Sequence, residues 1–107
     1  MTLDGRVTLV TGGAIRVGRA IVQALAAEGA TMAVHHHGSV DEARSLVAEL
    51  RSKGLRAEAF RADLTDDAQL GSLVADVERT VRFLIAGPGF ITGQVIAVDG
   101  GRVRGSP

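Results

Sequence analysis

A glycine-rich loop, Thr11-Gly12-Gly13-Ala14-Ile15-Arg16-Val17-Gly18, is the strongest chemical pattern in the chain. It follows an apolar, β-branched run at 7–10 and precedes a stretch of helical period. Glycines let the backbone turn sharply and approach a pyrophosphate, while the free amides and the dipole of the following helix attract negative charge. The pattern predicts dinucleotide contacts at Gly12, Arg16, Val17 and Gly18. The alternative is a tight turn that binds no ligand.

The end of the next strand, His35-His36-His37-Gly38-Ser39, bears on which dinucleotide is bound. In NAD sites an acidic side chain about 20 residues after the glycine loop binds the ribose 2′-hydroxyl. An acid would repel a 2′-phosphate, whereas His36, His37 and Ser39 can donate hydrogen bonds to one. Arg16 adds a permanent positive charge. The sequence therefore predicts NADP(H) rather than NAD(H), with Asp41 as a mild counter-argument.

Two weaker patterns have competing interpretations. Asp63-Leu64, after the third apolar run, can receive the adenine amino group, or Asp63 can simply begin a helix. His35 and His37 share one face of a strand and can approach one metal ion. No cysteine or nearby carboxylate pair completes a tetrahedral site, so we expect no metal.

These residues must be positioned by an α/β chain, because apolar runs alternate with stretches of helical period. We expect strands at 7–10, 31–35, 57–62 and 94–98. We expect one helix with an apolar stripe that includes Val17 and a second that begins with a capping box at 39–42. Thr65 should cap a third helix that continues to about residue 86. The first strand is apolar on both faces and should not lie at an edge. The prediction is a Rossmann-like three-layer α/β unit with a four-stranded parallel sheet of order 3-2-1-4.

Composition narrows the function classes. The chain has 107 residues, enough for one core, with 12 basic and 12 acidic side chains and a formal net charge of zero. Balanced charge argues against nucleic-acid and membrane-surface partners. No apolar stretch approaches the ~18 residues of a membrane span, and residues 2–4 do not open a signal peptide. With no cysteine, we expect a soluble cytoplasmic protein.

The glycine loop, the histidine-rich strand end, Ala62-Asp63-Leu64 and the terminal segment 90–101 together resemble short-chain dehydrogenase/reductases. Within that family the chain is most similar to pteridine-reductase-type members. Those members have an arginine at the position of Arg16, where most relatives have glycine, and a His-x-His-Arg-Ser strand end. Here Gly38 replaces the arginine of that strand end. The resemblance implies an NADP(H)-dependent carbonyl or pterin reductase lineage.

The resemblance also shows what is missing. Residues 1–79 resemble the N-terminal half of such an enzyme and 80–107 its last helix and strand, without the catalytic serine and Tyr-x-x-x-Lys segment between them. Hydride transfer to a carbonyl needs a proton donor beside the nicotinamide. The chain has no tyrosine, and its single lysine, Lys53, lies among solvated charges. We predict one internally shortened domain, 1–107, with no catalytic residues and uncertain activity.

Two alternatives to an NADP(H)-binding unit are open at this point. One is a non-enzymatic interaction module that forms homo-oligomers through a sheet edge or the final strand, because exposed edges pair readily. The other is a deletion product without a selected function.

Overall fold

Strands and helices alternate along the chain in the computed structural model, which describes residues 6–85 and 95–99, with side chains for 6–80. The elements are β1 (Val7–Thr11), α1 (Arg16–Ala27), β2 (Thr31–His36), α2 (Val40–Ser52), β3 (Ala57–Arg61), α3 (Asp67–Ile85) and β4 (Val95–Asp99). The α/β class is confirmed. The terminal motif at 90–101 lies outside the described residues except for β4, which begins one residue later than expected.

The strands form one sheet of order β3-β2-β1-β4, and every adjacent pair is parallel. β1 is an interior strand, because Val7 is in register with Thr31 on one side and Val95 on the other. All side chains at 7–10 are buried. An interior strand covered on both faces requires such a continuous apolar run, which explains the sequence of β1 and gives the order expected from it.

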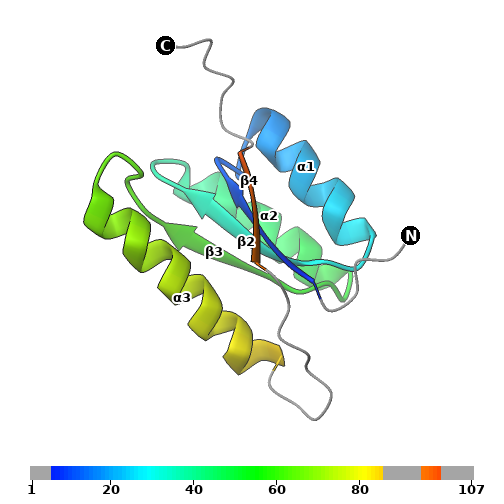
Figure 1. Ribbon diagram of the computed structural model, residues 1–107. Helices are drawn as coiled ribbons and strands as arrows, with labels where there is room; N and C mark the ends of the chain where they lie inside the picture. The colour runs from blue at the N-terminus through cyan, green and yellow to red at the C-terminus, as the bar shows by residue number, and fades with distance from the viewer. Residues whose placement is uncertain (1–5, 86–94, 100–107) are drawn as a thin grey trace.

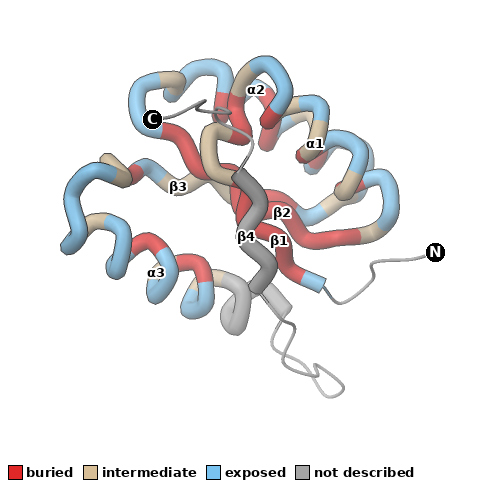
Figure 2. Tube along the Cα trace, turned by 45° about the horizontal axis from the view of Figure 1, so that its top comes forward, coloured by how far each residue is buried: buried red, intermediate tan, exposed pale blue. Residues whose placement is uncertain are grey.

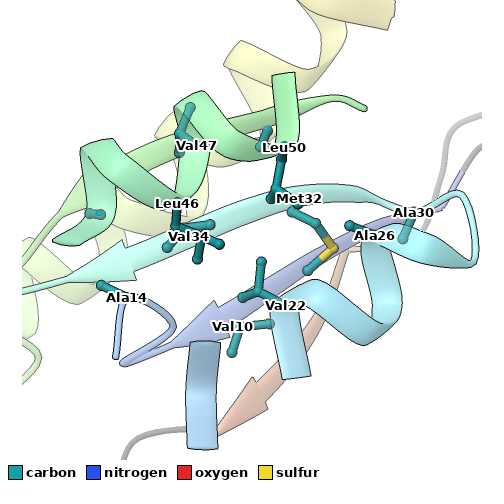
Figure 3. Close-up of a cluster of buried hydrophobic side chains, with 12 residues drawn as sticks. Val10, Ala14, Val22, Ala26, Ala30, Met32, Val34, Leu46, Val47 and Leu50 are labelled. Atoms are coloured by element: carbon teal, nitrogen blue, oxygen red, sulfur yellow. The ribbon is translucent and has the colours of Figure 1, made fainter. Parts of the chain in front are cut away.

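Helices cover both faces of the sheet, with α1 and α2 on one face and α3 on the other (Figure 1). Burial is concentrated in the strands and in the inward sides of the helices (Figure 2). The cluster beneath α1 and α2 is drawn in Figure 3 and contains Val10, Ala14, Val22, Ala26, Ala30, Met32, Val34, Ala43, Leu46, Val47, Leu50 and Ala57. The cluster beneath α3 contains Val7, Leu9, Ala33, Ala62, Leu73 and Val77. Two apolar faces on one sheet therefore produce the three layers.

The buried side of α1 differs from the expected one. Val17 was expected in the apolar stripe, but its side chain is 67% exposed, and Gly18, Val22 and Ala26 are buried instead. The reason is the close approach of Gly18 to the preceding loop, where only a residue without a Cβ fits. This contact fixes the rotation of the helix about its axis.

Two expected caps are also wrong. Ser39 is the N-cap of α2, but its side chain makes no capping hydrogen bond, so the capping box is not formed. At α3 the cap is Asp66, whose Oδ1 accepts from the amides of Ala68 at 2.9 Å and Gln69 at 3.3 Å. Thr65 is not the cap, because its hydroxyl donates to the Asp63 carboxylate at 2.7 Å.

In the described ranges no helix combines the length and apolar character that crossing a membrane would need. The backbone of α3 is helical throughout Asp67–Ile85. This single helix includes positions 79–80, where the two parts of the sequence resemblance meet.

Candidate functional site

The loop between β1 and α1 contains two residues in the left-handed backbone region. Gly12 has φ 63° and Arg16 has φ 53°. Glycine adopts this region freely, whereas a residue with a Cβ is strained there by about 1–2 kcal/mol. Arg16 thus holds an unfavourable conformation at the start of α1, and the residue is exposed. Such strain is typical of positions kept for function.

Gly18 and Gly13 allow the loop to fold tightly against β1. A Cβ on Gly18 would lie 2.1 Å from the Gly12 carbonyl oxygen, and a Cβ on Gly13 would lie 2.9 Å from the Val10 carbonyl oxygen. Both distances are shorter than non-bonded atoms tolerate. The two glycines therefore bring the N-terminus of α1 directly against the end of β1.

The amides that can face a ligand belong to the first turn of α1. The Gly12 amide donates to His35 Nδ1 at 3.0 Å, and the Gly13 amide donates to the His35 carbonyl oxygen at 3.0 Å. Within the described part of the chain, Arg19 is the first residue of α1 whose amide has a backbone acceptor, the Ile15 carbonyl. The amides of Arg16, Val17 and Gly18 precede it and, as at any helix N-terminus, have no acceptor within α1, which is the arrangement that binds anions in other proteins.

The three consecutive histidines have three different surroundings. His35 is buried, and its Nε2 lies 2.8 Å from the Ala62 carbonyl oxygen while Nδ1 accepts from Gly12. His36 is 5% exposed, and its Nδ1 has no hydrogen-bond partner. His37 is exposed. Since both ring nitrogens of His35 are already used, His35 and His37 do not form a metal-binding pair.

Two arginines, Arg61 and Arg44, interact electrostatically with His36. Arg61 is the register partner of His36 on the adjacent strand. Burial lowers the pKa of His36 below 6.5, and electrostatic interactions with the neighbouring His35, Arg61, Arg44 and His37 lower it further. Arg44 and Arg61 were missed because their place beside His36 depends on strand pairing and helix packing, which the sequence does not display.

The lowered pKa of His36 predicts a pH-dependent stability. Below pH 6.5 the unfolded chain binds a proton on this residue and the folded chain does not, so the free energy of unfolding falls as pH drops below 6.5. The slope from one such group is at most about 1.4 kcal/mol per pH unit. Urea titrations between pH 7.5 and about 5 should show a shallower fall for His36→Gln than for the wild type. Equal slopes in His36→Gln and the wild type would contradict the assignment.

The remaining predicted contacts lie at the same carboxyl edge of the sheet. Ser39 is half-buried with a hydroxyl that α2 does not use. The Thr65 hydroxyl and amide both donate to Asp63 Oδ1, and these bonds lower the pKa of Asp63. Asp63 thus forms the turn that leads to α3, but the cap of that helix is Asp66. Leu64 packs beside the cluster under α3.

A separate groove of about 240 Å³ lies between β3 and α3. Its lining residues are Ala59, Phe60, Arg61, Gln69, Ser72, Leu73 and Asp76. None of the predicted cofactor contacts lines this groove. The candidate site is therefore the open carboxyl edge of the sheet around the glycine loop, rather than an enclosed cavity.

Known proteins are similar to this chain over the elements described above. Residues 6–97 match the family model described as short chain dehydrogenase. The 2,3-dihydro-2,3-dihydroxybenzoate dehydrogenase of Bacillus subtilis is 32% identical over 77 residues, which are 72% of this chain and 29% of that enzyme.

Solved structures with NADPH or NADP bound also match this chain. A blue fluorescent protein from a metagenomic library, in complex with NADPH, matches with a TM-score of 0.73 and 41% identity over 76% of this chain and 34% of its own. An alternative dihydrofolate reductase of Brucella canis, complexed with NADP, matches with a TM-score of 0.61 and 33% identity over 73% of this chain and 29% of its own. The chain spans about a third of the length of these proteins.

Proposed function

The chain belongs to the short-chain dehydrogenase family, and from this premise we propose that it is an NADP(H)-binding unit of a reductase lineage. The observation that carries the proposal is the open first turn of α1, held against β1 by Gly13 and Gly18. Its amides and dipole provide the positive end that a pyrophosphate needs. The solved relatives with NADP or NADPH bound support the same cofactor class.

We assign the 2′-phosphate of the cofactor to the positively charged corner formed by the ends of β2 and β3 and the start of α2. The buried His36 Nδ1 lacks a partner, and the exposed His37 and the Ser39 hydroxyl lie close by in sequence. An acceptor-rich phosphate satisfies such groups, and arginine suits it best because its charge is permanent. Gly38 stands where pteridine-reductase-type members have an arginine, and Arg61 and Arg44 supply the positive charge in its place.

Within the short-chain dehydrogenase family, we propose that the chain belongs to the pteridine reductase lineage. Its support is Arg16 at a left-handed position that favours glycine, together with the histidine-rich strand end. The similarity to an alternative dihydrofolate reductase is consistent with it, because dihydrofolate contains a pterin ring.

Within these 107 residues we propose no reductase turnover. A bound NADPH supplies hydride, but a carbonyl acceptor also needs a proton donor at the developing alkoxide. The chain has no tyrosine, and Lys53 lies at the C-terminal end of α2, away from the glycine loop. We interpret the chain as one domain, 1–107, shortened between its two family-like parts, with α3 continuous where they meet.

Calorimetric titration with NADPH, NADH and 2′-phospho-AMP tests the proposal. We expect NADPH to bind at least about tenfold more tightly than NADH, which is about 1.4 kcal/mol, and 2′-phospho-AMP to compete with it. Arg61→Ala should weaken NADPH binding about fivefold to tenfold without affecting NADH, because it removes a charge-assisted contact. Arg56→Ala is the matched control, because Arg56 is also exposed but lies just before the opposite end of β3.

Equal wild-type affinity for NADPH and NADH would remove the 2′-phosphate assignment. If Arg61→Ala weakened the binding of NADPH and NADH equally, Arg61 would not belong to the 2′-phosphate site. Oxidation of NADPH by a pterin or carbonyl substrate, followed by nicotinamide absorbance, would contradict the proposed lack of turnover.

A further inference from the structure

His35 connects three segments of the carboxyl edge of the sheet through its own atoms. Its Nδ1 accepts from the Gly12 amide at 3.0 Å, and its carbonyl oxygen accepts from the Gly13 amide at 3.0 Å. Its Nε2 lies 2.8 Å from the Ala62 carbonyl oxygen, just past the end of β3. The glycine loop after β1 and the turn after β3 therefore both bond to one residue of β2.

These contacts define the protonation of the ring. An amide N–H can donate only to a nitrogen without a proton, so Nδ1 is bare. A carbonyl oxygen accepts, so Nε2 carries the proton and donates to Ala62. The ring is thus a neutral Nε2–H imidazole, buried with both nitrogens satisfied. No other neutral tautomer satisfies both partners.

We propose that His35 is the positioning residue of the glycine loop, and that it holds Gly12 in its left-handed conformation so that the first-turn amides of α1 stay open for a pyrophosphate. The inference rests on the proposed nucleotide binding but assigns to His35 no contact with the nucleotide. It is a different role from that of His36 and His37, because His35 has no free ring nitrogen to offer a phosphate.

The bond to Gly12 is the part that matters for binding. Gly12 is the turn at which the chain leaves β1, and its carbonyl oxygen is the atom against which Gly18 of α1 packs. The φ angle of Gly12 links this amide to the carbonyl group that follows it, so a change in that angle would move the oxygen and with it the start of α1. A partly buried amide left without an acceptor favours such a change, because an unmade hydrogen bond away from water is costly.

Two conservative variants separate the two side-chain bonds. His35→Asn places an acceptor near the position of Nδ1 and keeps the bond from Gly12, but it loses the donor to Ala62. His35→Gln reaches toward Ala62 and loses the acceptor for Gly12. If His35 were only a structural core residue, both variants would weaken nucleotide binding in proportion to their loss of stability.

The first readout is amide exchange at Gly12 by NMR on the full chain, which needs no nucleotide. We expect the Gly12 amide to stay protected within about threefold of the wild type in His35→Asn, and to lose protection about tenfold to hundredfold in His35→Gln, after correction for global stability. Nitrogen-15 shifts of the wild-type ring should show the Nε2–H tautomer. A protonated Nδ1, or equal protection in the two variants, would overturn the inference.

The second readout is NADPH affinity by calorimetry. We expect His35→Asn to bind within about threefold of the wild type and His35→Gln to bind at least about tenfold more weakly. Parallel losses would overturn the positioning role. A wild type that binds no NADPH would instead overturn the proposed function and the role of the loop in binding, while Gly12 exchange would still decide whether His35 fixes the loop.

Discussion

Gly18→Ala should disrupt the candidate site severely. The added Cβ would lie 2.1 Å from the Gly12 carbonyl oxygen and 2.8 Å from its carbonyl carbon. Both atoms are backbone, so no side chain can rotate away, and α1 must shift from β1. We expect a loss of about 3 kcal/mol in the free energy of unfolding, at the upper end of overpacking effects. NADPH affinity should fall at least about tenfold.

Gly71→Ala is the matched control for this substitution. Gly71 also lies inside a helix, α3, but a Cβ there meets nothing within 4 Å. Alanine is the better helix former by about 1 kcal/mol, so this variant should gain stability by roughly that amount and bind NADPH normally. Urea denaturation measures both variants on one scale. If Gly18→Ala were as stable as the wild type, the close packing of loop and helix would be wrong.

Leu46→Ala should produce a large loss of stability. Leu46 is fully buried between α2 and the sheet, within the cluster drawn in Figure 3. Truncation of a buried leucine removes its transfer free energy and leaves a cavity, at a cost of about 2–5 kcal/mol. Domains of this size unfold at about 5–15 kcal/mol, so the loss is a large fraction of the total.

Leu70→Ala controls for the loss of a leucine from a helix. Leu70 lies on α3 with 42% of its surface exposed, so its truncation should cost less than about 1 kcal/mol. Thermal unfolding followed by circular dichroism separates the two variants, because each kcal/mol shifts the Tm of a small domain by about 4–8 °C. Similar Tm values for the two would contradict the packing of α2 against the sheet.

The sequence was sufficient to predict the order and type of the elements and the place of the glycine loop. Local patterns carry this information: β1 is a continuous apolar run, and the glycines stand between a strand and a helix. A continuous apolar run is typical of a strand that is covered on both faces, so the sequence also implied that β1 is interior and that the sheet is parallel. These features depend on near neighbours in the chain, so their physical causes are visible in the sequence itself.

The sequence alone misassigned several side chains within those elements. Periodicity placed Val17 on the buried side of α1, yet the packing of Gly18 against Gly12 turned it outward. Thr65 was expected to cap α3, but Asp63 competes for its hydroxyl and Asp66 takes its place. In each case a contact that the local pattern does not reveal decides the position of the side chain.

Only the tertiary structure distinguished the roles of the three consecutive histidines. In the sequence, 35–37 is a uniform run; in the fold, His35 bonds to Gly12 and Ala62, which lie 23 and 27 residues away along the chain. His36 meets Arg61 through strand register, and His37 lies beyond the strand in solvent. Identical side chains acquire different hydrogen bonds and burial because these depend on partners from other strands, and parallel strands bring such partners together only across long chain separations.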